Sequence, residues 1–162
     1  MNELLGWLEA SALGETIRGA GVWSYGIVNA AHILGIATLF GAILVLDLRL
    51  IGWRRAKGTT DLAAATVPVA ATGIALALVT GVCLLATNAT EYRGNPFLMI
   101  KFGAIALGLI NLLVLHRLPG WRALRDGKEP DGTQRRTLTV GGAISLASWL
   151  VALVSGRMLG YW

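Results

Sequence analysis

Four long runs without a charged side chain divide this sequence. They cover residues 19–46, 62–90, 102–116 and 137–156. A helix needs about 20 apolar residues to cross the roughly 30 Å hydrocarbon layer of a membrane, and the first, second and fourth runs reach that length. The third run reaches it only if its helix starts near Pro96 and takes Lys101 into the membrane, where the long side chain extends to the interface. The pattern therefore predicts four membrane-spanning helices.

The composition favours lipid over water as the solvent of this chain. Hydrophobic residues make up 55% of the sequence, and the mean hydropathy is +0.64, both higher than in typical soluble domains. We therefore expect an all-α fold, an integral membrane four-helix bundle that forms one domain over residues 1–162. The membrane helices are expected at about 22–50, 62–88, 96–118 and 137–160.

Two weaker patterns extend this architecture. Residues 3–18 place their large apolar side chains near one side of a helix, which predicts a helix lying on the membrane surface, with a frayed tail as the alternative. Residues 77–84 (ALVTGVCL) resemble residues 152–159 (ALVSGRML). If this is an internal repeat, the bundle consists of two pseudo-repeated helical hairpins with an axis along the membrane normal.

The basic residues predict the orientation of the chain. Of the 14 Lys and Arg residues, four lie in residues 49–57 and six in residues 117–136. The positive-inside rule places both segments in the cytoplasm and both termini outside. Aromatic residues agree with this orientation, because the expected outer ends carry Trp23, Tyr25, Tyr92, Tyr161 and Trp162, and the expected inner ends carry Trp53 and Trp121.

This orientation indicates a multi-pass protein of a bacterial inner membrane. The lipid bilayer is one expected partner, and a homo-oligomer or a larger membrane complex is another. The net charge of +5 is explained by orientation signals, so we expect no nucleic acid partner. Residues 119–135, rich in Gly and Pro, predict a flexible cytoplasmic connector.

Polar side chains inside membrane helices are costly and are therefore candidates for function. Imidazoles from facing helices can ligate haem b, which makes the two histidines of this chain candidates. One iron shared by His32 and His116 conflicts with their depths, because His116 is expected near the level of Asp47, about 22 Å along the helix from His32. A haem that uses either histidine with another ligand or a second protomer stays open. The candidate cofactor-binding residues are His32, His116, Lys101, Arg157 and Asn29.

The expected outer half also holds one soft ligand group on each helix. An imidazole, a thiol and thioethers suit Cu(I), although Met and Cys also fill gaps in ordinary cores. The candidate metal ligands are His32, Cys83, Met99 and Met158. At the inner end we expect a structural polar cluster of Asp47, Arg49 and Arg117, in which Asp47 accepts from either arginine or from His116.

No motif of an enzyme is recognisable. The sequence lacks a Ser/His/Asp set, a phosphate-binding glycine loop and a HExxH helix, which favours a non-enzymatic role. The residues favour a redox-type module that binds haem b or another cofactor between its helices. The alternatives are a non-catalytic subunit or scaffold of a larger complex and a copper-handling membrane protein.

Several motifs together resemble a known family. They are His32-Ile33-Leu34-Gly35, Gly41, Asp47 to Gly52 (DLRLIG), Thr80-Gly81, Phe97 to Lys101 (FLMIK), Asn111, His116, Gly156-Arg157 and Tyr161. Over nearly its whole length, the chain resembles small bacterial four-helix inner-membrane proteins grouped as a domain of unknown function. That resemblance implies the four-helix fold and no particular activity. More distantly, the His-x-x-Gly of the first helix is similar to copper-resistance D and cytochrome b561 membrane modules, which have fuller histidine sets.

Overall fold

Four long helices dominate the computed structural model, which describes residues 2–53 and 58–161. They are α3 (Val22–Ile51), α4 (Thr59–Thr87), α5 (Pro96–Arg117) and α7 (Gly132–Met158), and each is long and apolar enough to cross a membrane. The described residues contain no strand. The prediction of an all-α chain with four membrane-length helices is therefore confirmed. The predicted orientation signals Arg54, Arg55 and Lys57 and the predicted interfacial Trp162 lie outside the described residues.

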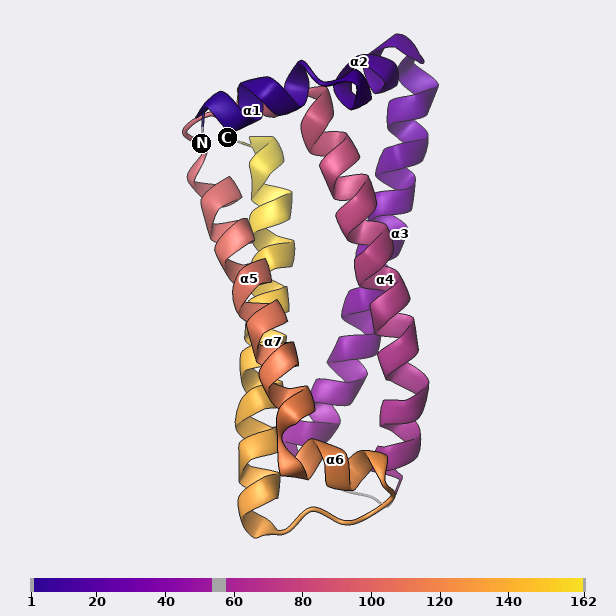
Figure 1. Ribbon diagram of the computed structural model, residues 1–162, viewed down its shortest axis with the longest axis vertical. Helices are drawn as coiled ribbons and strands as arrows, with labels where there is room; N and C mark the ends of the chain where they lie inside the picture. Colours follow the sequence, from indigo (N-terminus) through magenta and orange to yellow (C-terminus); the bar gives the residue numbers. More distant parts are fainter. Residues whose placement is uncertain (1, 54–57, 162) are drawn as a thin grey trace.

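The long helices form two antiparallel pairs (Figure 1). α3 packs along α4, α5 packs along α7, and α3 and α7 connect the two pairs. Both termini lie at one end of the molecule, which we call the terminal end, and α6 (Pro119–Arg125) lies across the opposite end, the α6 end (Figure 1). The repeat of two hairpins that the sequence suggests stays a prediction.

Small residues allow α3 and α4 to approach closely. A Cβ atom added to Gly35 would lie 2.7 Å from the backbone nitrogen of Ala77, and one added to Gly73 would lie 2.5 Å from that of Leu39. Helices in lipid gain stability from such close packing, because lipid tails are as apolar as the helix surface. Gly35, Gly73 and Ala77 therefore form part of the interface between α3 and α4.

Two short helices lie across the terminal end where the sequence predicts one. α1 (Asn2–Glu9) and α2 (Ala12–Gly19) are separate because Ser11 caps the start of α2, its hydroxyl accepting from the backbone N–H of Gly14. The buried side chain of Leu5 packs against Leu98 of α5 and Ala89 of the 3-10 helix η1 (Ala89–Tyr92). A second 3-10 helix, η2 (Leu159–Tyr161), ends the described chain.

Polar contacts fasten α2 to the end of α4 and α1 to η1. The guanidinium of Arg18 donates to the carbonyl oxygen of Thr87 over 3.0 Å and to that of Glu9 over 2.8 Å. The last carbonyls of a helix lack partners within the helix, so a cation there is favourable. The carboxylate of Glu9 accepts from the backbone N–H of Thr90 over 2.6 Å. Hydrogen bonding to Thr90 holds the pKa of Glu9 below its ordinary value.

The expectation of a flexible connector over residues 119–135 is wrong for its first part. Pro119 occupies the start of α6, a position that suits proline because no backbone N–H is needed there. Trp121 and Leu124 lie three residues apart, which places them on one face of the helix. Both are buried in a cluster with Leu46, Leu50, Ala63, Leu115 and Leu138. This burial holds α6 across the end of the bundle.

The helix α7 begins earlier than the sequence indicates. It starts at Gly132 rather than near residue 137, because Asp131 and Gln134 form a capping box. The Asp131 carboxylate accepts from the backbone N–H of Gln134 over 2.8 Å, and the Gln134 side chain accepts from the N–H of Asp131 over 3.2 Å. The third long helix, in contrast, begins at Pro96 and includes Lys101, as expected.

Candidate functional site

An apolar cavity lies between the two helix pairs near the α6 end. Its volume is about 290 Å³, and all four long helices and α6 contribute to its wall. Most of the wall is aliphatic or aromatic, with Leu39, Ile43, Leu46, Val67, Ile74, Leu109, Trp121 and Trp149 among the lining residues. Five lining residues have polar side chains: Asp47, Thr66, Asn111, His116 and Ser145. We call this space the Asp47 cavity.

Asp47 is the acidic side chain of this wall. It lies one turn before the end of α3 and exposes only 3% of its surface. The carboxyl of Asp47 interacts with the hydroxyl of Ser145 on α7. Among the described residues, its Oδ2 atom has no hydrogen-bond partner. The cavity therefore contains a buried carboxyl oxygen that is free to accept a hydrogen bond.

Close packing between α3 and α7 fixes the position of Asp47. A Cβ atom on Gly142 of α7 would lie 3.1 Å from the Cβ of Leu50 and 3.3 Å from the carbonyl oxygen of Asp47. One turn away, the hydroxyl of Thr139 donates to the carbonyl oxygen of Leu50 over 2.9 Å. Asp47 is thus held on a rigid backbone rather than on a loop.

Asn111 of α5 completes the polar side of the cavity. It is buried, and its Nδ2 donates to the carbonyl oxygen of Gly141 over 2.9 Å. This bond joins α5 to α7 at the level at which α7 meets α3. The three helices therefore surround one polar region, formed by Asp47, Asn111 and Ser145.

His116 lies at the rim of the cavity. Its Nδ1 lies 2.8 Å from the carbonyl oxygen of Leu112, and its ring centroid lies 4.7 Å from that of Trp121. A carbonyl only accepts, so Nδ1 carries the proton in this bond. The neutral imidazole then presents Nε2 as an acceptor.

The rim of the cavity lies between α4 and α5. Ala71 of α4 and Leu112 and His116 of α5 line the cavity and are exposed on the helix surface. α4 packs mainly on α3 and α5 mainly on α7, so these two helices leave room between their side chains at this level. Both helices are long and apolar enough to cross a membrane.

His32 belongs to a different part of the molecule. Its Nδ1 lies 3.0 Å from the hydroxyl oxygen of Thr80 on α4, and that hydroxyl donates to the carbonyl oxygen of Leu76 over 2.6 Å. Since the hydroxyl proton is used there, Nδ1 of His32 donates to Thr80. The imidazole lies over Gly81, where an added Cβ would approach its Cε1 to 3.0 Å. Asn29, one turn earlier, is half-buried.

The two histidines do not form a site for one haem. His116 lines the cavity beside Asp47, whereas His32 is absent from that wall and lies fifteen residues before Asp47 on α3. At about 1.5 Å per residue, the separation along the helix is about 22 Å, far more than two iron–nitrogen bonds span. The residues present therefore do not fit a haem ligated by both histidines of one chain.

Lys101 and Arg157 have different surroundings. Lys101 is half-buried, and its Nζ would lie 3.5 Å from a Cβ on Gly156, so it packs against α7 near the terminal end. Arg157 is exposed, donates to the hydroxyl of Tyr161 over 2.5 Å and lies 4.8 Å from the centre of that ring. Neither residue lines the Asp47 cavity.

The predicted copper ligands differ in their exposure. Met99 and Met158 are 52% and 37% exposed, whereas Cys83 is half-buried. Within residues 2–53 and 58–161, no three His, Cys, Asp or Glu side chains lie close enough to hold a metal ion. The copper site built from His32, Cys83, Met99 and Met158, two of whose ligands are thioethers, stays a prediction.

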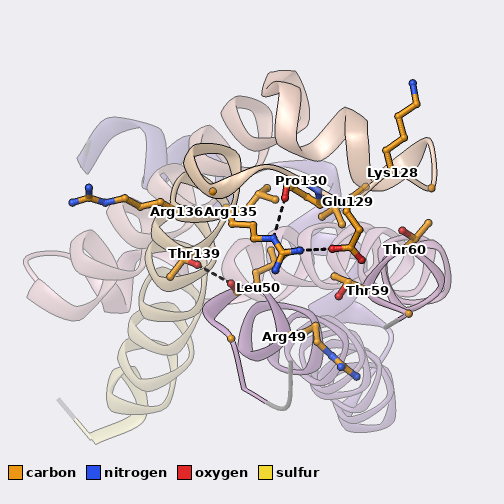
Figure 2. A pocket seen from close by; sticks show the side chains of 16 residues that line it. Arg49, Leu50, Thr59, Thr60, Lys128, Glu129, Pro130, Arg135, Arg136 and Thr139 are labelled. Atoms are coloured by element: carbon orange, nitrogen blue, oxygen red, sulfur yellow. Dashed lines mark hydrogen bonds and ion pairs between the residues drawn. The ribbon is translucent and has the colours of Figure 1, made fainter. Parts of the chain in front are cut away.

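A second, larger cleft opens at the α6 end (Figure 2). It measures about 830 Å³, and its lining includes Arg49. Arg135 donates to the carbonyl oxygen of Pro130 over 2.9 Å and forms an ion pair with Glu129. Lys128 and Arg136 extend away from that pair in opposite directions (Figure 2). The cations therefore do not converge on a common point, and this cleft carries no site.

The expected cluster of Asp47, Arg49 and Arg117 is divided in the structure. Asp47 lines the apolar cavity, Arg49 lines the cleft at the α6 end, and Arg117 is exposed at the end of α5. Ser145 interacts with Asp47 instead. In the sequence, Ser145 recurs with Gly141 and Ser148 at steps of four and three residues, the spacing of one helix face.

Comparison with known proteins gives no assignment. Neither a protein-family model, nor a curated protein, nor a solved structure matches this chain. The resemblance to four-helix inner-membrane proteins stays a prediction. The case for the candidate site is therefore based only on the geometry of the residues that form it.

Proposed function

We propose that this protein binds a small lipophilic molecule that carries a hydrogen-bond donor, and that the molecule reaches the Asp47 cavity from the lipid phase between α4 and α5. The observation that carries this proposal is the Oδ2 atom of Asp47, which has no hydrogen-bond partner within residues 2–53 and 58–161 and lies in a mostly apolar wall. The sequence led us to expect haem b or another cofactor between the helices, and the proposed ligand belongs to the second of these classes.

The unpartnered oxygen favours a ligand with a donor. A buried acceptor without a partner costs about 1–3 kcal/mol, and more if it is charged. A water molecule needs two to four polar partners to be held in a cavity, whereas most of this wall is apolar. A hydroxyl or amine on an apolar body satisfies Asp47 and fills the remaining space.

The volume limits the size of the ligand. An apolar cavity of about 150 Å³ holds one benzene molecule, so 290 Å³ corresponds to about two fused rings. Specific ligand pockets range from about 300 to 1,000 Å³, which places this one at the small end. A porphyrin, with four pyrrole rings in one plane, is too large for it.

The proposal also includes the orientation of the protein in the membrane. We propose a four-helix bundle in a bacterial inner membrane, with α1 and α2 on the outer surface and the Asp47 cavity in the cytoplasmic half. The basic residues near the α6 end and the positive-inside rule support this orientation. In a Cys83→Ala background, a cysteine placed at residue 126 should react only with reagents that reach the cytoplasm, and one at residue 93 should react from outside. The opposite pattern would reverse the orientation.

Binding of 1-naphthol tests the proposed function. This probe has two fused rings and one hydroxyl. Binding to protein in nanodiscs is compared with binding to a cavity-filled variant, Ala70→Phe, so that partitioning into lipid is subtracted. We expect saturable binding to the unmodified protein and none to Ala70→Phe.

Variants at the carboxyl group distinguish specific binding in the cavity from nonspecific binding to the apolar surface of the protein. A hydrogen bond contributes about 0.5–1.5 kcal/mol, and about 1.5–3 kcal/mol where one partner is charged, so Asp47→Asn should weaken 1-naphthol binding by several-fold to about a hundredfold. The matched control is Asp61→Asn, because Asp61 is an exposed acid on α4 outside the cavity. Equal binding of 1-naphthol by the unmodified protein, Asp47→Asn and Ala70→Phe would refute the proposal.

A further inference from the structure

We infer that the ligand class of the Asp47 cavity is a membrane hydroquinone, held by Asp47 and His116 as acceptors for its two hydroxyl groups. This inference rests on the proposed function and makes it more specific. It depends on three observations: the position of the two acceptors, the aromatic wall and the apolar end of the cavity.

The two acceptors lie near the same end of the cavity on different helices. Leu46 of α3 and Leu115 of α5 belong to one buried cluster with Trp121, and they directly precede Asp47 and His116 in sequence. Both acceptor residues also line the cavity. Each of these two helices therefore contributes one acceptor residue to the wall around a ligand.

Each acceptor has an unused lone pair. The Oδ2 atom of Asp47 has no partner within the described part of the chain. Nδ1 of His116 is engaged with the carbonyl of Leu112, which leaves Nε2 for a ligand. A ring with hydroxyl groups on opposite sides donates to both, whereas a quinone ring offers only acceptors.

The wall of the cavity suits a flat ring. Trp121 and Trp149 line it, and both are buried. The indole of Trp149 lies against Gly108, where an added Cβ would approach its Cε2 to 3.0 Å, so the ring is held in place by α5. Indole rings pack well against other aromatic rings, in stacked or edge-to-face arrangements.

The rest of the cavity extends away from the α6 end and is apolar. Leu39 and Ile43 precede Asp47 on α3 by two turns and one turn, and Ile74 lies at their level on α4. A ring placed across the cavity at Asp47 would thus direct an apolar substituent toward the middle of the bilayer. This is the arrangement of a hydroquinone with a hydrocarbon tail.

A matched set of probes tests this inference. We compare the binding of three probes to the protein in nanodiscs without oxygen: 1-naphthol, 1,4-dihydroxynaphthalene and 1,4-naphthoquinone. Binding to nanodiscs that hold Ala70→Phe is subtracted for each probe, which removes the contribution of partitioning into lipid. We expect the second hydroxyl to increase affinity about tenfold, which corresponds to one hydrogen bond. The quinone should bind more weakly than the dihydroxy compound. In His116→Phe, the affinity ratio of the two hydroxyl probes should fall to about one.

The outcomes separate the two proposals. If 1-naphthol binds in an Asp47-dependent way but the second hydroxyl adds nothing, or if its gain persists in His116→Phe, the hydroquinone inference is refuted and the proposed function stands. Equal affinity of the quinone and the dihydroxy compound also refutes it. If 1-naphthol itself does not distinguish the unmodified protein from Ala70→Phe, both proposals fail. Far-UV circular dichroism checks that each variant remains helical.

Discussion

Gly73 of α4 offers a direct test of the packing between α3 and α4. In Gly73→Ala, the new Cβ would lie 2.5 Å from the backbone nitrogen of Leu39 and 2.9 Å from the carbonyl oxygen of Gly35. Ordinary contact begins at 3.4 Å, so the helices must separate by about 0.9 Å, the difference between 3.4 and 2.5 Å. Overpacking of this kind costs about 1–3 kcal/mol, and the better helix propensity of alanine returns up to about 1 kcal/mol. We expect a net loss of about 1–2 kcal/mol.

Unfolding in mixed micelles with increasing dodecyl sulfate, followed by far-UV circular dichroism, measures this loss. The matched control is Gly41→Ala on α3, because a Cβ there meets nothing within 4 Å. The control should be at least as stable as the unmodified protein. Equal stability of Gly73→Ala and Gly41→Ala would refute the close approach of the two backbones.

Two further predictions concern polar contacts between elements. Asn111→Leu removes the 2.9 Å hydrogen bond to Gly141 and should lower the free energy of unfolding by about 0.6–1.7 kcal/mol, the range for such bonds in membranes. The same micelle titration measures this loss of stability. An unchanged free energy of unfolding would show that α5 and α7 do not need this bond. The pKa of Glu9 is held below its ordinary value of 4.5 by Thr90, so the contact of α1 with η1 contributes stability above pH 4.5 and loses it as the pH falls through the lower, folded-state pKa. The hydrogen-exchange protection factors of residues 2–19, which correct for the pH dependence of intrinsic exchange, should therefore fall in acid, and Glu9→Gln should remove that fall.

The architecture follows largely from the sequence because lipid restricts the choices. A chain with four long apolar runs can satisfy its backbone in lipid only as helices or a closed barrel, and runs of this length indicate helices. The glycines at 35 and 73 were recognisable as an interface because small residues recur there at helical spacing. Pro96 and Lys101 lie within α5 as expected, since a shorter helix would not cross the hydrocarbon layer.

The site follows less from the sequence because it depends on how the helix pairs sit against each other. Asp47 was recognisable as a costly intramembrane acid, yet its expected partners were Arg49, Arg117 or His116, the nearest polar groups by depth. Rotation of α3 about its axis decides which of these it meets, and no pattern of apolar residues determines that rotation. The helix α6 was missed because Pro119 and Gly120 indicated a loop, although Trp121 and Leu124 already had helical spacing.

Photolabelling tests the central claim, a lipid-accessible binding cavity at Asp47, most directly. A 1-naphthol derivative with a diazirine group is irradiated with the protein in nanodiscs, and labelled peptides are identified by mass spectrometry. We predict labelling at cavity residues such as Leu46, Val67 and Leu112, competition by unlabelled 1-naphthol, and loss of the label in Ala70→Phe. Labelling confined to exposed residues such as Leu78 and Val79, unaffected by competitor or by Ala70→Phe, would contradict it.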